Sequence, residues 1–216
     1  MLLIKNTVTI WEKEPNSKIM ALYKFDEVLN DLMDYFILGD PDYLLQYKIK
    51  NNLPDDLLTE FTTEETGDRV VEEGVIVPMI GIENYPYTVY FNLSDETPEL
   101  LKQGNEVQHQ RDGYCLKVVN GRIYLYTIPY LRDFTETKLG LLKKYKHATI
   151  ELPNGWYSVI ILAGLTKQLL KVETVSGEIE EFESMEPTFE FVLKSSVEKQ
   201  DYTADFTYPF KVEIHE

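Results

Sequence analysis

The chain has 216 residues, of which 44% are hydrophobic and 12% aromatic, a globular composition that excludes a disordered protein. Its 37 Asp and Glu residues outnumber its 21 Lys and Arg residues, which gives a formal net charge of −16 at pH 7. A chain this acidic repels nucleic acids and anionic membrane surfaces, whereas it attracts cationic partners.

The number of cysteines and the length of the apolar runs indicate the cellular compartment in which the protein is expected. Cys115 is the only cysteine, so an intrachain disulfide is impossible and a reducing compartment is expected. The N-terminal sequence MLLIKNTVTIWEKE lacks the basic region and the small-residue cleavage site of a signal peptide. The longest apolar run, residues 159–165, is much shorter than the ~18 residues that span a bilayer. We therefore expect a cytoplasmic protein without a membrane partner.

The first elements in chain order are a predicted strand and a predicted helix. Residues 2–11 (LLIKNTVTIW) are rich in β-branched residues and predict a strand. Residues 25–38 carry apolar side chains at the spacing of one helical face, and Gly39 ends this predicted helix.

Two further helix starts follow. Asp40-Pro41 predicts a helix that Asp40 caps and in which Pro41 occupies the first turn. Residues 53–56 (LPDD) predict another start, so residues 18–62 form a helical segment of two or three short helices. Residues 62–74 are polar and acidic without a sustained apolar period, and they predict a loop.

The rest of the chain is predicted to be mostly strand. Short helices are expected at residues 96–103 and 135–145, and strands are expected at residues 75–82, 87–93, 187–193 and 208–214. Three turns predict β-hairpins: Asn120-Gly121, Pro153-Asn154-Gly155 and Ser176-Gly177. Hairpins favour antiparallel sheets. We expect an α+β fold in one domain, residues 1–216, with β-rich antiparallel sheets (a sandwich or an open barrel) from about residue 74 onward.

No catalytic, cofactor or metal motif stands out, so none is predicted. The chain lacks a Walker-type loop, a Rossmann fingerprint, a nucleophile elbow and a zinc-binding pattern. His109, His147 and His215 lack ligand spacing. Cys115 lies within a predicted strand, where a cysteine is usually a small buried apolar residue.

Basic residues and the acids at helix starts have structural interpretations. The run Lys143-Lys144-Tyr145-Lys146-His147 is the only local cationic cluster, and cations favour helix ends. Nucleic-acid binding needs a broader electropositive face and is not expected. The acids of residues 40, 42, 55 and 56 stand at helix starts, where carboxylates cap free amides.

One acidic segment is the candidate partner-binding site. It spans residues 55–73, which contain eight acidic residues and a single basic one, Arg69. Aromatic residues in and near this segment could supply apolar anchors for a partner. The acids are Asp55, Asp56, Glu60, Glu64, Glu65, Asp68, Glu72 and Glu73, and the aromatic anchors are Tyr43, Tyr47 and Phe61. A second segment, residues 173–190, holds seven acids without Lys or Arg. The alternative for both segments is a solvated surface or a charged sheet edge.

Residues 150–164, IELPNGWYSVIILAG, carry the one family resemblance. The Pro-x-Gly-x-Tyr pattern before an apolar strand resembles small β-rich bacterial proteins, some of which are immunity proteins that neutralise secreted toxins. The resemblance implies a cytosolic, non-enzymatic inhibitor, often acidic because many such toxins are basic nucleases. It transfers no functional residue, because Pro153, Gly155 and Tyr157 have structural positions.

Three hypotheses for function follow. The first is a non-enzymatic acidic module that binds a basic protein partner, such as a toxin. The second is an enzyme or small-ligand binder whose site combines scattered residues such as His109 and Cys115, which requires a pocket with convergent polar groups. The third is a structural component that assembles through its sheet edges.

Overall fold

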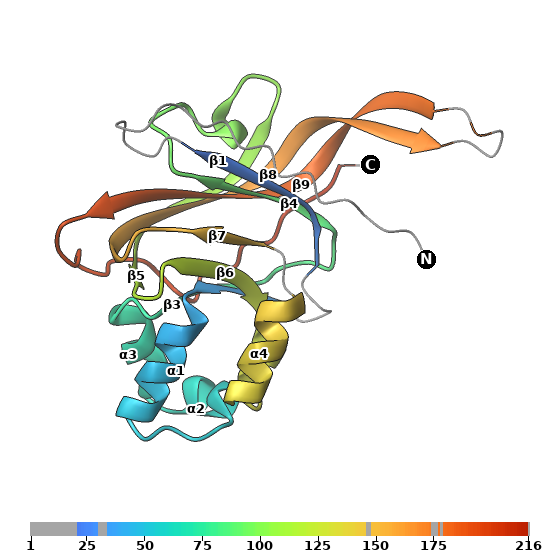
Figure 1. Ribbon diagram of the computed structural model, residues 1–216. Helices are drawn as coiled ribbons and strands as arrows, with labels where there is room; N and C mark the ends of the chain where they lie inside the picture. The colour runs from blue at the N-terminus through green and yellow to red at the C-terminus, as the bar shows by residue number, and fades with distance from the viewer. Residues whose placement is uncertain (1–20, 30–33, 146–147, 174–176, 178, 216) are drawn as a thin grey trace.

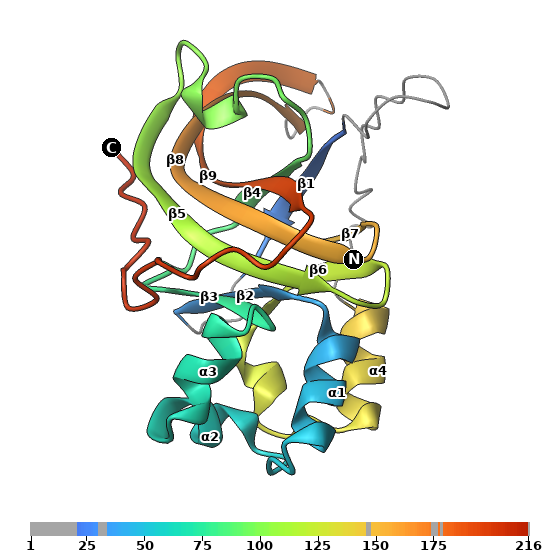
Figure 2. The same ribbon diagram turned by 90° about the vertical axis from the view of Figure 1, so that its left-hand side faces the viewer.

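The computed structural model describes residues 21–29, 34–145, 148–173, 177 and 179–215, and it has the predicted α+β fold. Two sheets and a set of helices form three layers (Figures 1 and 2). Sheet A has the order β1 (Leu22–Val28), β4 (Tyr87–Asn92), β9 (Ile179–Ser196), β8 (Gly155–Glu173) and β5 (Glu106–Val118). Sheet B has the order β3 (Ile76–Ile80), β2 (Tyr35–Gly39), β6 (Arg122–Thr127) and β7 (Thr149–Glu151).

The helices cover the face of sheet B that points away from sheet A (Figures 1 and 2). They are α1 (Pro41–Lys50), α2 (Leu57–Thr63), α3 (Thr66–Glu72) and α4 (Glu136–Tyr145). Two 3₁₀ helices, η1 (Glu99–Leu101) and η2 (Ile128–Leu131), lie in connections. The strand pairs are antiparallel except for β4 with β9, so the prediction of antiparallel sheets is confirmed.

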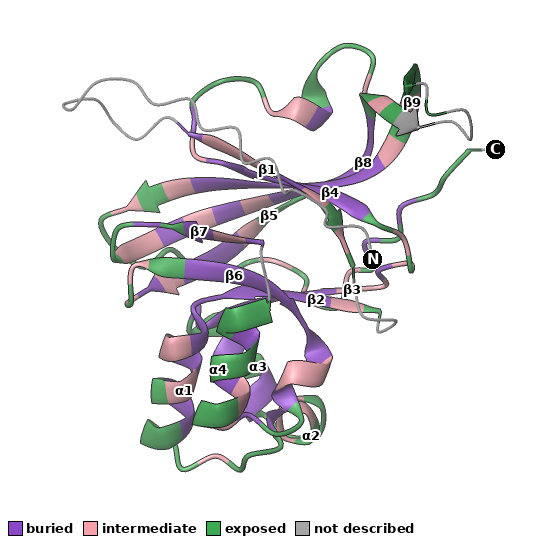
Figure 3. Ribbon diagram, turned by 45° about the vertical axis from the view of Figure 1, so that its right-hand side comes forward, coloured by how far each residue is buried: buried purple, intermediate pink, exposed green. Residues whose placement is uncertain are grey.

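Sheet B is buried on both faces, which its sequence reflects. Phe36 and Leu38 of β2 pack in the core between the two sheets, whereas Ile37 packs in the core between sheet B and the helices. A strand that is covered on both faces reads as a continuous apolar run instead of an alternating one. Figure 3 accordingly shows most of β2 and β6 as buried.

The helix predicted for residues 25–38 is wrong. Residues 22–28 form β1, which pairs with β4, and residues 35–39 form β2, which lies between β3 and β6. Sheet pairing and burial override the local helical spacing, which short apolar runs do not distinguish from a buried strand. Helices in the described part of residues 18–62 therefore begin only at Pro41. The strand predicted for residues 2–11 lies outside the described residues.

The loop predicted for residues 62–74 is also wrong, because it contains α3. Val70 and Val71 are buried against sheet B and α1, so a helix forms despite the acidic surroundings. Gly67 allows α3 to pack closely on α2, since a Cβ atom there would lie 2.0 Å from the carbonyl oxygen of Phe61. The signal for α3 in the sequence is the spacing of Thr66, Val70 and Val71 on one helical face.

Two of the three predicted hairpins are instead corners between the sheets. The Asn120-Gly121 turn joins β5 of sheet A to β6 of sheet B, and the turn at residues 153–155 joins β7 of sheet B to β8 of sheet A. The corners lie side by side, because the Gly121 amide donates to the Asn154 side chain over 2.8 Å. A two-stranded ribbon thus passes from one sheet into the other, as at the corners of orthogonally packed sheets.

The third predicted hairpin is confirmed and extends beyond sheet A. β8 and β9 stay paired from Trp156 with Ser196 to Glu173 with Ile179. Residues 166–173 and 179–186, here called the β8–β9 arm, project from the sheet (Figure 1).

The C-terminal segment is not the strand predicted for residues 208–214. Residues 203–213, here called the strap, run between β5 and β3 with only an isolated bridge from Ile80 to Pro209. The Thr203 amide donates to the Gly113 carbonyl of β5, and the Phe210 amide donates to the Ile80 carbonyl of β3. The strap therefore fastens the edge of sheet A to the edge of sheet B.

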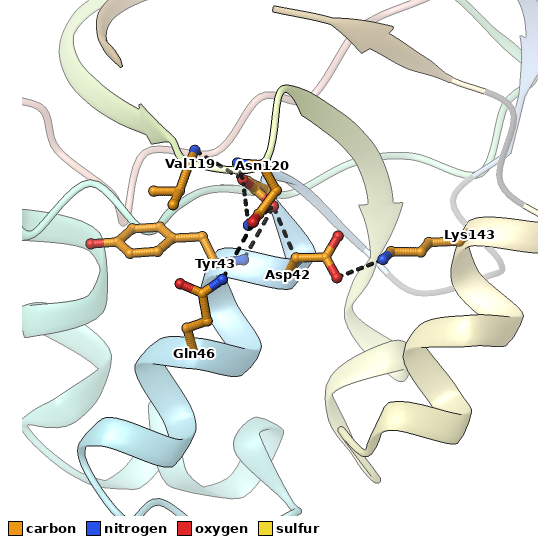
Figure 4. A network of polar contacts seen from close by, with 7 residues as sticks. Asp42, Tyr43, Gln46, Val119, Asn120 and Lys143 are labelled. Carbon is orange, nitrogen blue, oxygen red and sulfur yellow. Dashed lines mark hydrogen bonds and ion pairs between the residues drawn. The ribbon is translucent and has the colours of Figure 1, made fainter. Parts of the chain in front are cut away.

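Asp40 joins the helical layer to the sheet corner. One carboxylate oxygen accepts the amides of Asp42 and Tyr43 and so caps α1, as the sequence predicts. The other oxygen accepts the amides of Val119 and Asn120 over 3.0 and 2.8 Å. Figure 4 shows this network, in which the corner before β6 meets the first turn of α1. The Asp40 side chain is buried, with 1% of the residue exposed.

We expect Asp40→Asn to destabilise the protein by about 3 kcal/mol or more, because an amide group would then face backbone amides that need acceptors. Urea unfolding of the purified variant measures the change. Asp42→Asn is the matched control, because Asp42 lies two residues after Asp40 in the first turn of α1. This variant loses an exposed ion pair with Lys143, which is worth about 1 kcal/mol or less. Equal losses for the two variants would contradict the role assigned to Asp40.

Candidate functional site

The first acids of the candidate segment, Asp55 and Asp56, have structural partners. Asp55 forms an ion pair with Lys48, and its carbonyl accepts the Phe134 amide over 2.7 Å. Asp56 caps α2 by accepting the amide and the hydroxyl of Thr59, and these hydrogen bonds lower the pKa of the Asp56 carboxyl. Both residues therefore hold the start of α2, and Asp55 also holds its contact with Phe134, two residues before α4.

The later acids of the segment, apart from Glu60, are exposed. Glu60 accepts the Thr66 hydroxyl over 2.8 Å. The other acids are exposed on or beside α3, and none forms an ion pair within the described residues. These five residues, here called the α3 acids, are Glu64, Glu65, Asp68, Glu72 and Glu73.

The three predicted aromatic anchors lie in different environments. Tyr47 is buried in the core between sheet B and the helices, with 5% exposed. Tyr43 is half-buried, and the Lys117 ammonium group lies 5.8 Å from its ring centroid. Burial and then the negative charge of Glu73 raise the pKa of both tyrosines, so Glu73 lies close to them. Phe61 of α2 is half-buried and faces a cavity.

This cavity, of about 300 Å³, lies between α2, α3, sheet B and the strap. Its walls are mostly apolar, and Asp68 is the only charged residue among those that line it. Residues that form the walls include Leu58, Phe61, Val70, Ile80, Leu131 and Phe206. Of the α3 acids, Asp68 therefore lies at the apolar opening, an arrangement typical of an interface with an apolar centre and a polar rim.

The sequence predicted only Phe61 and Asp68 among the residues that line this cavity. The remaining walls come from β2, β3, η2 and the strap, which are distant in sequence. Phe206 lies in the strap, and no local pattern indicates that this segment returns to sheet B. Val70 and Val71 could have been found from their helical spacing within the acidic segment.

The second acidic segment is less free than its composition indicates. On the β8–β9 arm, Lys167 pairs with Glu183 and Lys171 pairs with Glu181, so lysines of β8 partly neutralise the acids of β9. Glu190 is fully buried, where it accepts the Asn92 side chain over 2.8 Å and the Leu100 amide over 3.0 Å. Glu190 thus anchors η1 to sheet A and adds nothing to a docking surface.

The scattered residues considered for an enzyme do not come together. Cys115 and His109 lie six positions apart on β5, about 20 Å at the rise of an extended strand. Burial raises the pKa of the Cys115 thiol, which disfavours the thiolate that nucleophilic catalysis requires. His109 instead holds the strap, with its ring nitrogens 2.8 Å from the Tyr208 hydroxyl and 2.7 Å from the Lys211 carbonyl.

The described residues contain neither a metal-binding cluster nor a helix suited to cross a membrane. No group of three or more His, Cys, Asp or Glu side chains in that part of the chain is arranged to hold a metal ion. None of the described helices combines the length and hydropathy needed to cross a membrane.

Comparison with known proteins leaves the family open. No protein-family model and no curated protein matches the chain. Among solved structures, a chain described as "Crocagin biosynthetic gene J" is similar at 10% sequence identity and a TM-score of 0.44. The similarity covers 81% of this chain and 96% of that chain. At this TM-score, the similarity supports no conclusion about function.

The buried Glu190 carboxyl should make the stability of the protein depend on pH. Burial raises its pKa above the ordinary value, so its contribution to stability is full at low pH and is lost as the pH rises through the raised pKa. Because the Gln side chain does not titrate, we expect Glu190→Gln to lower stability most at low pH, where the protonated Glu190 carboxyl makes its full contribution. The cost should shrink towards pH 8.

Urea unfolding of the wild type and of Glu190→Gln across this pH range measures the difference between their free energies of unfolding. The other carboxyl groups are the same in both proteins, so their contributions cancel in this difference. A difference that is constant with pH would contradict this account of Glu190.

Proposed function

We propose that this protein is a non-enzymatic binding module for a basic protein, and that the partner docks on the α3 acids beside the apolar cavity. The observation that carries the proposal is the exposure of five carboxylates on and beside α3 without ion pairs among the described residues, one of which lines the apolar cavity. Asp68 belongs to both features, because it is one of the α3 acids and also lines the cavity.

Electrostatics favours this class of partner. The net charge of −16 attracts a basic protein over about 10 Å at moderate ionic strength, and it repels acidic ones. Residues 64–73 contribute five acids against Arg69 alone. Complementary charge accelerates association and selects the partner, whereas apolar contacts supply most of the affinity. Both components are available on this face.

An inhibitor of a basic toxin is the specific form of this proposal that the sequence resemblance favours. The resemblance itself lies elsewhere in the fold, at the corner before β8, where the Tyr157 hydroxyl donates to the Pro153 carbonyl over 2.8 Å. These residues support the corner, so the inhibitory surface would be the α3 acids. We place the function in the cytoplasm, because the single cysteine fits a reducing compartment.

Affinity capture from the native host, with three versions of the protein as bait, tests the proposal. In the test variant, Glu64, Glu65 and Asp68 are all replaced by Lys. In the control variant, Glu96, Glu180 and Glu198 are replaced by Lys, which changes the net charge equally at exposed positions on the side of sheet A. We expect the wild type and the control to retain a basic protein that the test variant loses at least tenfold.

Salt dependence completes this test. The affinity of the purified complex should fall as the salt concentration rises from 50 to 500 mM, because exposed charges are screened over shorter distances. A partner that is neutral or acidic, or one that all three baits retain equally, would refute the proposal.

A further inference from the structure

The mostly apolar cavity between α2, α3, sheet B and the strap opens beside Asp68. We infer that it receives one large apolar side chain, aromatic or aliphatic, from a cationic segment of the partner protein. This inference rests on the proposed function and specifies the sequence class of the segment that docks.

The size and the walls of the cavity fit a side chain. Its volume of about 300 Å³ stands at the lower limit of the ~300–1,000 Å³ typical of pockets for whole small molecules. The polar residues of its lining, such as Thr62, Asp68 and Thr207, are exposed positions, while Val70 and Leu131 are buried. Polar groups therefore lie at the mouth and apolar groups lie inside, as in pockets that hold an interface anchor.

The walls are held in place by contacts within the chain. The strap wall, which contains Phe206, continues into Tyr208, whose ring lies 3.8 Å from the Arg111 guanidinium carbon. The Tyr208 hydroxyl also contacts His109, and the Phe210 amide bonds to Ile80 on the opposite wall. A preformed cavity lowers the ordering cost of binding, which favours insertion of a single anchor.

Charge at the mouth selects the segment that carries the anchor. Asp68 lines the opening, and Glu64 and Glu65 precede it at the start of α3. A segment that inserts an apolar side chain here brings its neighbouring residues against these carboxylates. Lys or Arg residues beside the anchor supply the complementary charge, whereas Asp or Glu residues are repelled.

A random 12-residue peptide library displayed on phage is the probe that tests this inference. Selection against the wild type should enrich peptides with a Trp, Phe or Leu flanked by Lys or Arg. Selection against Thr62→Trp, which fills the mouth from an exposed position, should retain the basic residues but lose the apolar one. Thr207→Trp fills the mouth from the strap and serves as the second variant should Thr62→Trp fail to fold.

The affinities of one enriched peptide and its anchor→Ala analogue give the quantitative result. We expect the wild type to bind the parent peptide at least tenfold more tightly than the analogue, and Thr62→Trp to bind both equally. Basic peptides without a shared apolar residue would overturn this inference and leave the proposed function standing. Peptides without basic residues would overturn both.

A second copy of this chain is the competing occupant. Sedimentation of the wild type and of Thr62→Trp distinguishes it: a dimer that forms in the wild type and disappears in the variant would overturn the inference.

Discussion

The buried carboxylate of Asp40 is the interaction on which the arrangement of the layers depends. It follows directly after β2, caps α1, and accepts the amides of Val119 and Asn120 at the corner between the sheets. A buried carboxylate is costly unless donors surround it, and four backbone amides meet this condition. The same contact therefore sets where the chain leaves sheet B and enters the helical layer.

The candidate site is assembled from segments that only the complete fold brings together. The ribbon that turns through the two Asn-Gly corners joins the sheets along one edge, and the strap joins them along β5 and β3. The strap also supplies Phe206 to the cavity, opposite α2 and α3. The apolar opening is therefore a product of the tertiary structure, whereas the acids beside it belong to one short stretch of sequence.

Features with a local physical cause were predictable, and features with a distant cause were not. Asp40 and Asp56 cap helices through their own neighbouring amides, and the β8–β9 hairpin depends on adjacent residues. The Asn120-Gly121 turn has the sequence of a hairpin, yet Asp40, eighty positions away, accepts its amides at a sheet corner. The helical period of residues 25–38 likewise yields to pairing with β4, β3 and β6. Composition alone also failed to distinguish the buried Glu190 from the exposed α3 acids.

A carboxylate in the lining of an apolar opening, such as that of Asp68, has consequences for selectivity that neither feature has alone. A neutral apolar segment that docked there would remove water from Asp68 without supplying a counter-charge, which opposes its binding. A highly basic segment without an apolar residue would gain only screened surface attractions, each worth about 1 kcal/mol or less. A segment with both properties avoids the first cost and adds the burial of its anchor, at roughly 25 cal/mol per Å² of apolar surface. For the binding function that we propose, selectivity for cationic amphipathic segments therefore follows from the position of Asp68 in the lining of the cavity.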